Sequence, residues 1–330
     1  MPPLDVHAHF LPSDVFRDIY AKYGSQDIQF SLTDGSLTFR YSDTSYFGKV
    51  DPNFATEEGM IESLDRQKLK KRLLSIFPNA LPLSLEHEAL SQLMKDINNR
   101  LGEMTGRHPD RLGGLATVPM HKPEEAAEEL RRTVKDLGFV GALVGSNVNG
   151  KNLDDPSLSP FFAEVERLGV PIFIHPMAPR AGGARISRFQ LGNIIGNPLE
   201  TTIAAGSLIF GGVLQRYKGL KIVLVHGGGF LPYQFGRFDW AYHARPEIGA
   251  LIPKQPSAYM ENFYFDTILH DAPSLEYMIS KVGASHVVLG SDYPFDMGYP
   301  DPVGVVTSLK LPPDAEEAIL SANAERIFHL

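Results

Sequence analysis

The chain has 330 residues, of which 43% are hydrophobic, so it can form a full core and disorder is excluded as its dominant state. Its 31 Lys and Arg against 39 Asp and Glu give a net charge of −8, which argues against a nucleic-acid partner. Because the chain has no cysteine, disulfides, iron–sulfur clusters and cysteine nucleophiles are excluded, and any metal must be held by His and carboxylate.

The first residues predict a cytoplasmic protein with no membrane partner. The start, Met-Pro-Pro-Leu-Asp, lacks the basic and apolar regions of a signal peptide. The longest apolar run, 202–214, is too short to span a bilayer. We therefore expect a soluble, intracellular protein.

Short β-branched runs alternate with amphipathic helical stretches along the chain, which favours parallel strands joined by helices. Segment 122–137 is typical of an outer helix, since Ala126, Leu130 and Val134 fall on one face. Several runs are almost continuously apolar, as expected for strands covered on both faces. We predict strands at 4–10, 72–77, 113–119, 141–146, 171–175, 221–226, 262–269 and 286–292.

These strand–helix units predict an α/β fold, the (β/α)8 TIM barrel, as a single domain over residues 1–330. Length alone would fit two domains equally well. The stretch between the first two strands is too long for one crossover helix, and it contains the strand-like segments 27–32 and 37–41 around an Asp-Gly turn. We therefore predict a small β-hairpin insertion after the first strand, within about residues 15–60. The basic run 66–72 is interpreted as a solvated helix face.

Polar side chains end several of the predicted strands. His7 and His9 are two residues apart on the first strand, so both project from one face. His175, His226 and Asp292 each end a later strand, and barrel sites lie at the carboxyl ends of the strands. Each residue alone could cap a strand or helix. Together they predict a metal site.

The fourth strand bears on the number of metal ions. A bridged two-metal site needs a shared anionic ligand, commonly a modified Lys or a Glu there, and segment 141–147 contains neither. We therefore predict one divalent metal per chain, held by His7, His9, His175 and Asp292, with Zn²⁺ favoured and Mn²⁺ or Fe²⁺ compatible. A metal-bound water would be the nucleophile or proton source, with His226 as its general base.

Two rival chemistries lack their motifs. The His226-Gly-Gly-Gly sequence imitates the oxyanion loop of lipases, but the chain has no Gly-x-Ser-x-Gly elbow. No Gly-x-Gly-x-x-Gly turn follows the first strand and no phosphate-binding Gly-Lys-Ser/Thr is present, so we predict no organic cofactor. The glycines after His226 are interpreted as allowing the backbone to approach a ligand closely.

The motifs together resemble the amidohydrolase superfamily, and more narrowly its decarboxylase branch, typified by 2-amino-3-carboxymuconate-6-semialdehyde decarboxylase. The resemblance covers nearly the whole chain, including the sequences at 137–141, 198–203, 263–266 and 289–295. It implies a zinc ion on His7, His9, His175 and Asp292, with Asp292 positioning the metal and His226 acting on the metal-bound water.

The resemblance also implies two arginines that hold substrate carboxylates. These are Arg40, in the predicted hairpin, and Arg237, which would reach the active site of the neighbouring subunit in a homodimer. Composition alone would make each a surface residue, but the planar guanidinium grips a carboxylate in two places. Phe295 completes the predicted substrate-binding set.

The chain departs from the family pattern at two pocket positions, where Met177 and Asn193 replace tryptophans and Trp240 is the sole tryptophan. The substrate can therefore be a different acid. The leading hypothesis is a zinc-dependent, cofactor-free decarboxylase of an unsaturated or aromatic carboxylic acid, of the 2-amino-3-carboxymuconate-6-semialdehyde or hydroxybenzoate type. The alternative is a metal-dependent hydrolase, including a C–C bond hydrolase, or a hydratase. The complete ligand set disfavours a binding protein that has lost turnover.

Overall fold

The computed structural model describes residues 2–11, 14–15, 17–18, 28–33, 36–41, 44–83, 85–177 and 181–330, and for most of residues 28–48, Arg40 included, it describes the backbone alone. The central sheet has eight strands in the order β1-β5-β6-β7-β10-β11-β12-β13. The paired strands are parallel. Their bounds are β1 Leu4–Phe10, β5 Lys71–Ile76, β6 Leu112–Thr117, β7 Gly141–Gly145, β10 Ile172–His175, β11 Ile222–Leu224, β12 Phe263–Asp266 and β13 Val287–Val288.

This sheet confirms the predicted (β/α)8 barrel, because each strand overlaps one of the predicted runs. The last strand is shorter than predicted, since the chain beyond Val288 turns to bond with β1. The N–H of Val6 donates to Leu289 O at 2.9 Å, and the N–H of His9 donates to Tyr293 O at 2.8 Å. Segment 289–293 therefore closes the barrel between its last and first strands.

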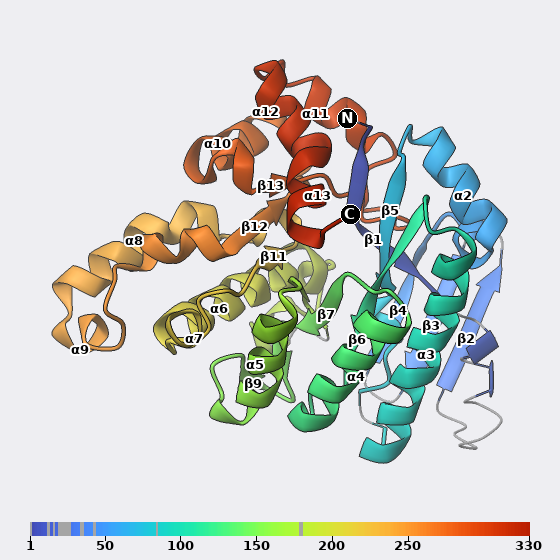
Figure 1. Ribbon diagram of the computed structural model, residues 1–330, viewed down its shortest axis with the longest axis horizontal. Helices are drawn as coiled ribbons and strands as arrows, with labels where there is room; N and C mark the ends of the chain where they lie inside the picture. The colour runs from blue at the N-terminus through green and yellow to red at the C-terminus, as the bar shows by residue number, and fades with distance from the viewer. Residues whose placement is uncertain are drawn as a thin grey trace.

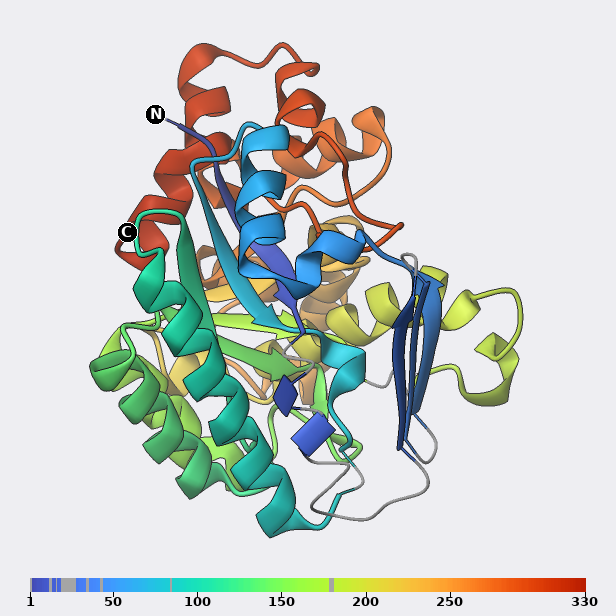
Figure 2. The same ribbon diagram turned by 90° about the vertical axis from the view of Figure 1, so that its right-hand side faces the viewer.

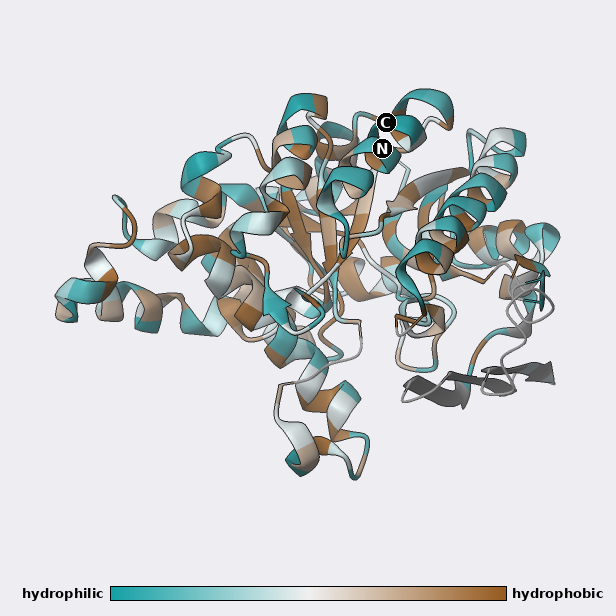
Figure 3. Ribbon diagram, turned by 90° about the horizontal axis from the view of Figure 1, so that it is seen from below, coloured by the Kyte–Doolittle hydropathy of each residue, from teal (hydrophilic) through white to brown (hydrophobic). Residues whose placement is uncertain are grey.

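Helices surround the strands, and the hydropathy colouring shows brown strands inside a largely teal outer layer (Figures 1 and 3). Helix α4 is typical: it begins with a proline and two glutamates in its first turn, and it buries Ala126 and Leu130 against the barrel. Among the described residues, no helix is both long and apolar enough to cross a membrane. The longer helices are α2 Glu57–Arg66, α3 His87–Arg107, α4 Pro123–Asp136, α5 Ser159–Leu168, α6 Asn197–Phe210, α8 Leu231–Ala244 and α10 Ala272–Val282; the shorter ones are α7 Val213–Arg216, α9 Pro246–Gly249, α11 Pro302–Thr307, α12 Pro313–Glu317 and α13 Asn323–Phe328.

A separate antiparallel sheet lies between β1 and β5 in the sequence. It consists of β2 Ile28–Thr33, β3 Ser36–Tyr41 and β4 Thr44–Lys49, in the order β2-β3-β4. The predicted segments 27–32 and 37–41 overlap β2 and β3. In Figure 2 this dark blue sheet stands beside the barrel. A further short pair, β8 Asn147–Val148 and β9 Lys151–Asn152, follows β7.

The interpretation of residues 66–72 as a solvated helix face is wrong. Helix α2 ends at Arg66, and β5 already begins at Lys71. Arg72 is fully buried, where its Nε donates to Asp5 Oδ2 at 2.8 Å and its Nη1 donates to Ser63 Oγ at 2.6 Å. A buried guanidinium needs such partners, since an unpaired charge in the interior is costly. The ion pair with β1 therefore explains why Arg72 lies inside.

Candidate functional site

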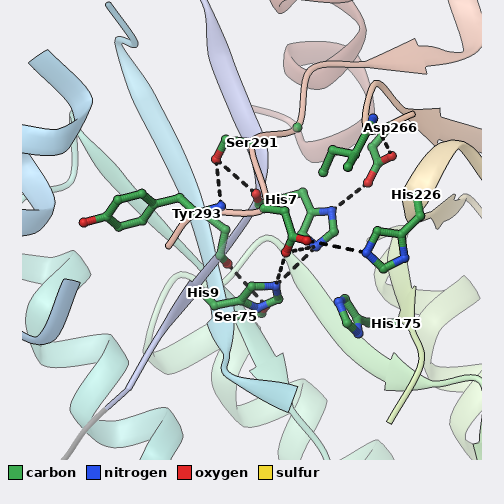
Figure 4. A network of polar contacts seen from close by, with 12 residues as sticks. His7, His9, Ser75, His175, His226, Asp266, Ser291 and Tyr293 are labelled. Atoms are coloured by element: carbon green, nitrogen blue, oxygen red, sulfur yellow. Dashed lines mark hydrogen bonds and ion pairs between the residues drawn. The ribbon is translucent and has the colours of Figure 1, made fainter. Parts of the chain in front are cut away.

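The predicted ligands converge at the carboxyl ends of the barrel strands (Figure 4). His7, His9, His175 and Asp292 are buried, and one ligand atom from each lies within 4.8 Å of the others. The Nε2 atoms of His7 and His9 are 3.2 Å apart, and Asp292 Oδ1 lies 3.3 Å and 3.1 Å from them. The predicted convergence is confirmed, although these residues are up to 285 positions apart.

The outer nitrogens of the histidines are held by the surrounding protein. His7 Nδ1 lies 2.6 Å from Asp266 Oδ2, and His175 Nδ1 lies 2.9 Å from Pro176 O. His9 Nδ1 has two partners, Ile76 O at 3.2 Å and Ser75 Oγ at 3.0 Å. Metal-binding histidines typically engage their second nitrogen in this way, which fixes the tautomer and the ring orientation.

Among the three predicted histidine ligands, one ring nitrogen has no hydrogen-bond partner in the described part of the chain. His175 Nε2 is buried and accepts or donates no hydrogen bond among the described residues. An unpaired buried nitrogen costs free energy unless a ligand satisfies it. The site thus offers three imidazoles and one carboxylate, and His175 Nε2 is available to bind a ligand. This set of donors fits a divalent cation.

The protonation states of the ligands follow from burial and mutual contact. Burial lowers the pKa of His9, and it lowers the pKa of His175 further. Burial also opposes the ionised form of Asp292, but the positive charge on His7 and hydrogen bonds from histidines hold its pKa well below the usual range. Burial lowers the pKa of His7, yet Asp292 and Asp266 outweigh it and raise the pKa to about 10. Neutral imidazole and ionised carboxylate are the forms that bind metals.

Asp266 is a site residue that the sequence analysis did not assign. It ends β12, its Oδ2 faces His7, and its Oδ1 accepts the N–H of Gly227 at 2.8 Å and of Ile268 at 3.1 Å. The signal was a carboxylate at the end of an apolar strand, the same signal that identified His175. Asp266 therefore connects β1 to the loop that follows β11.

The glycines after His226 are required by protein neighbours. Gly229 has φ +63°, and a Cβ there would lie 2.1 Å from Pro198 O in α6. Gly227 has φ +61° and a Cβ would lie 2.5 Å from Leu269. Since L side chains rarely adopt such angles, glycine allows this loop to pass between α6 and β12. The loop places His226, whose own φ is +54°.

His226 and Phe295 lie beside the four ligands. His226 Nε2 is 3.6 Å from Asp292 Oδ2, and its side chain is 17% exposed. The His226 ring centroid lies 5.3 Å from that of His175 and 5.5 Å from that of His7. The Phe295 ring centroid is 5.2 Å from that of His9. Both residues therefore border the site, and His226 combines contact with Asp292 and access to solvent.

The two predicted arginines lie on β3 and α8. Arg237 lies exposed on α8, and it forms no ion pair with the described side chains. Arg40 lies in β3, and its side chain is outside the described part of the structure. Their predicted contacts with substrate stay predictions.

A second missed feature positions Asp292. Asp5 Oδ2 accepts Ser291 Oγ–H at 2.6 Å, and Asp5 Oδ1 accepts the N–H groups of His7 at 3.1 Å and Ser291 at 3.0 Å. Asp292, with φ +56°, follows directly and donates its N–H to His7 O at 2.8 Å. Asp5 and its partner Arg72 thus fix the two segments that carry ligands.

Comparison with known proteins places this site in a family. A model of the Amidohydro_2 amidohydrolase family matches residues 4–330. The chain is 35% identical over 328 residues to 2-amino-3-carboxymuconate-6-semialdehyde decarboxylase of Dictyostelium discoideum, covering 97% of this chain and 90% of the relative. It is 32% identical over 252 residues to gamma-resorcylate decarboxylase of Rhodococcus jostii, covering 72% and 76%.

Solved structures give the same fold. The 5-carboxyvanillate decarboxylase of Sphingomonas paucimobilis superposes with a TM-score of 0.84 at 24% identity, covering 100% of this chain and 99% of the other. A dihydroxybenzoic acid decarboxylase from a Polaromonas species, with bound manganese and the inhibitor 2-nitroresorcinol, superposes with a TM-score of 0.79 at 26% identity, covering 100% and 97%. The motifs, the barrel and the full-length family match agree, and the chain belongs to the amidohydrolase family.

Proposed function

We propose that the protein is a metal-dependent decarboxylase of an unsaturated or aromatic carboxylic acid, of the 2-amino-3-carboxymuconate-6-semialdehyde or hydroxybenzoate type. The observation that carries the proposal is the buried cluster of three histidines and one aspartate, with His226 beside it. Both relatives named above, which cover most of the chain, are decarboxylases.

One divalent cation would be held by His7, His9, His175 and Asp292, with no organic cofactor. We favour Zn²⁺ on the ligand set, and Mn²⁺ is the strongest competitor because a relative of known structure holds it. When bound, such a cation acts as a Lewis acid that draws electron density from the substrate.

The chain's own residues would bind the acid and move a proton. Arg40 and Arg237 grip carboxylates, and Phe295 packs against the substrate beside His9. His226, whose Nε2 lies 3.6 Å from Asp292 Oδ2, acts as the general base: it accepts a proton from water in the site and later returns it. The bond between the carboxylate and its carbon breaks, CO₂ leaves, and the electron pair left on that carbon takes up the proton from His226.

We also propose a homodimer in which Arg237 completes the partner's site, in a cytoplasmic protein. Arg237 is free of ion pairs with the described residues and lies on the exposed surface of α8. On the same helix, Tyr233 is 76% exposed and Trp240 is 75% exposed. Large exposed apolar side chains are typical of surfaces that associate.

Product analysis tests the proposed activity. Purified protein, loaded in turn with Zn²⁺ and Mn²⁺, is incubated with a panel of muconate and hydroxybenzoate acids while CO₂ is measured. We expect CO₂ release without net uptake of water. Uptake of one water per turnover, with no CO₂, would instead indicate the hydrolase or hydratase alternative. Elemental analysis should find about one transition metal per chain.

A further inference from the structure

Glu200 is a buried carboxylate that joins three segments near the predicted metal site. It lies in the first turn of α6 and is 4% exposed. Its Oε2 accepts hydrogen bonds from Ser146 Oγ at 2.8 Å and from Asn147 Nδ2 at 3.1 Å, and its Oε1 accepts the Ala181 N–H at 2.7 Å. Because a carboxylate is stable in the interior only when its oxygens are hydrogen-bonded, Glu200 and these donors hold one another in place.

Two of the joined segments lie next to His175. Ser146 directly follows Gly145, the residue of β7 that pairs with His175 of β10. Ala181 lies six positions beyond His175 on the same chain. Glu200 is therefore bonded both to the strand beside this predicted ligand and to the loop that follows it.

The sheet does not hold the chain beyond His175. The ladder between β10 and β11 ends at the pair Ile174–Leu224, and the ladder between β10 and β7 ends at His175. Among the described residues, the next hydrogen bond from this chain to another element is the one from the Ala181 N–H to Glu200. The loop after β10 thus depends on Glu200 for its anchor.

The path of this loop bears on the tautomer of His175. The Pro176 carbonyl oxygen lies 2.9 Å from His175 Nδ1, and because a carbonyl only accepts hydrogen bonds, the proton of the neutral ring lies on Nδ1. His175 Nε2, which has no hydrogen-bond partner in the described part of the chain, then carries the lone pair that can bind a cation. Movement of the Pro176 carbonyl would remove this preference.

We propose that Glu200 is a positioning residue for His175. By holding Ala181 and the end of β7, it keeps the Pro176 carbonyl at Nδ1 and so keeps Nε2 ready to bind the cation. Glu200 itself does not belong to the ligand set. The inference rests on the proposed function only for the presence of the metal, and it connects α6, which carries none of the predicted ligands, to the metal site.

A double-mutant cycle tests the proposal through zinc affinity, measured on folded protein by competition with a chelator. Glu200→Met keeps the length of the side chain but offers no oxygen to the donors. It should lower zinc affinity about 10- to 100-fold, the scale for losing the support of a histidine ligand. In a His175→Ala background the same substitution should change zinc affinity less than about twofold, because the residue through which Glu200 acts is absent.

Two further variants separate positioning from general loosening of the fold. Glu200→Gln can keep an oxygen toward the Ala181 N–H while its NH₂ donates to Ser146 Oγ, since a hydroxyl both donates and accepts, so zinc affinity should stay within about threefold of wild type. Glu129→Met is the matched control, because Glu129 is likewise buried and accepts from Asn98 Nδ2 at 2.7 Å, which is not a predicted ligand. It should lower the urea midpoint and leave zinc affinity unchanged.

A milder variant keeps the test decisive if Glu200→Met does not fold. Ser146→Ala removes a single donor to the Glu200 carboxylate and takes the same place in the cycle. It should lower zinc affinity about two- to tenfold, the scale of one hydrogen bond, and only when His175 is present.

The outcomes separate this inference from the proposed function. Unchanged zinc affinity in folded Glu200→Met, an equal loss with and without His175, an equal loss in Glu129→Met, or failure of Glu200→Gln to restore affinity overturns the inference. Because zinc affinity is measured without substrate, the expected pattern supports the inference whether or not any acid loses CO₂. Absence of CO₂ from every acid overturns the decarboxylase proposal alone.

Discussion

Replacing Asp266 by Asn should weaken metal binding without unfolding the protein. The Asp266 carboxylate accepts hydrogen bonds at both oxygens, from His7 Nδ1 at 2.6 Å and from the N–H groups of Gly227 and Ile268. Asn keeps a single carbonyl oxygen. Its NH₂ group must therefore face either the two backbone donors, which opposes donor to donor, or His7, whose Nδ1 must then accept the hydrogen bond.

The magnitude follows from this geometry. If the NH₂ group faces His7, the ring must carry its proton at Nε2, the nitrogen that points to Asp292 and to the predicted metal. Loss of such an outer partner reduces metal affinity about 10- to 100-fold, which corresponds to about 1.4–2.8 kcal/mol. Asp266→Ala would leave two buried N–H groups without acceptors, each costing about 1–3 kcal/mol of folding stability, so Asn separates the two effects better.

Zinc affinity is measured by competition with a chelator of known strength, and folding is measured by urea denaturation of the metal-free protein. Asp271→Asn is the matched control, because Asp271 caps α10 by accepting the Ser274 N–H at 3.0 Å and Asn caps helices equally well. The control should bind zinc as tightly as wild type. A folded Asp266→Asn variant with undiminished zinc affinity would refute the role assigned to the hydrogen bond with His7.

Three further predictions concern proton transfer, assembly and pH. His226→Asn should retain the metal but lose about 100-fold or more in kcat, the scale expected for deletion of a general acid–base group. Near-full activity would contradict the role in proton transfer. Loss of the metal would show instead that His226 is a metal ligand. The variants Arg40→Ala and Arg237→Ala should each be nearly inactive. When equal amounts are refolded together, mixed dimers should recover up to about a quarter of wild-type activity. Verified mixed dimers that recover no activity would contradict an active site built from both subunits. A hydrogen bond from Arg167 helps to lower the pKa of Glu164 from 4.5 to about 2, so this ion pair stabilises the fold above pH 4.5 and is lost as pH falls towards 2. Glu164→Gln should therefore cost about 1 kcal/mol at pH 7 in urea denaturation and nothing near pH 2; an equal cost at both pH values contradicts the assignment.

The strands and the central ligands could be predicted because their signals are local. An apolar run that ends in His or Asp specifies both a buried strand and a polar group at its carboxyl end, and the barrel fold then brings those ends together. His7 and His9 needed only the two-residue repeat of a strand. The same rule identifies His175.

The supporting residues could not be predicted because they depend on distant partners. In the sequence, Arg72 is indistinguishable from the other basic residues of segment 66–72. Only the pairing of β1 with β5 brings it beside Asp5. Ser75 became relevant because the same pairing sets it against His9. Asn98 on α3 bonds to both backbone polar groups of Thr117 on β6, a contact that no local pattern contains.

The closure of the barrel has a consequence for the order of biosynthesis. The segment that joins the last strand to the first also carries Asp292, while His7 and His9 lie on the first strand. The ribosome makes these ligands 285 residues apart, an interval of about 15–60 s at 5–20 residues per second. The nascent chain thus carries two adjacent imidazoles long before their carboxylate partner exists. A high-affinity metal centre and a closed barrel are therefore completed together, late in synthesis, and any cation captured earlier is held by an incomplete set of ligands.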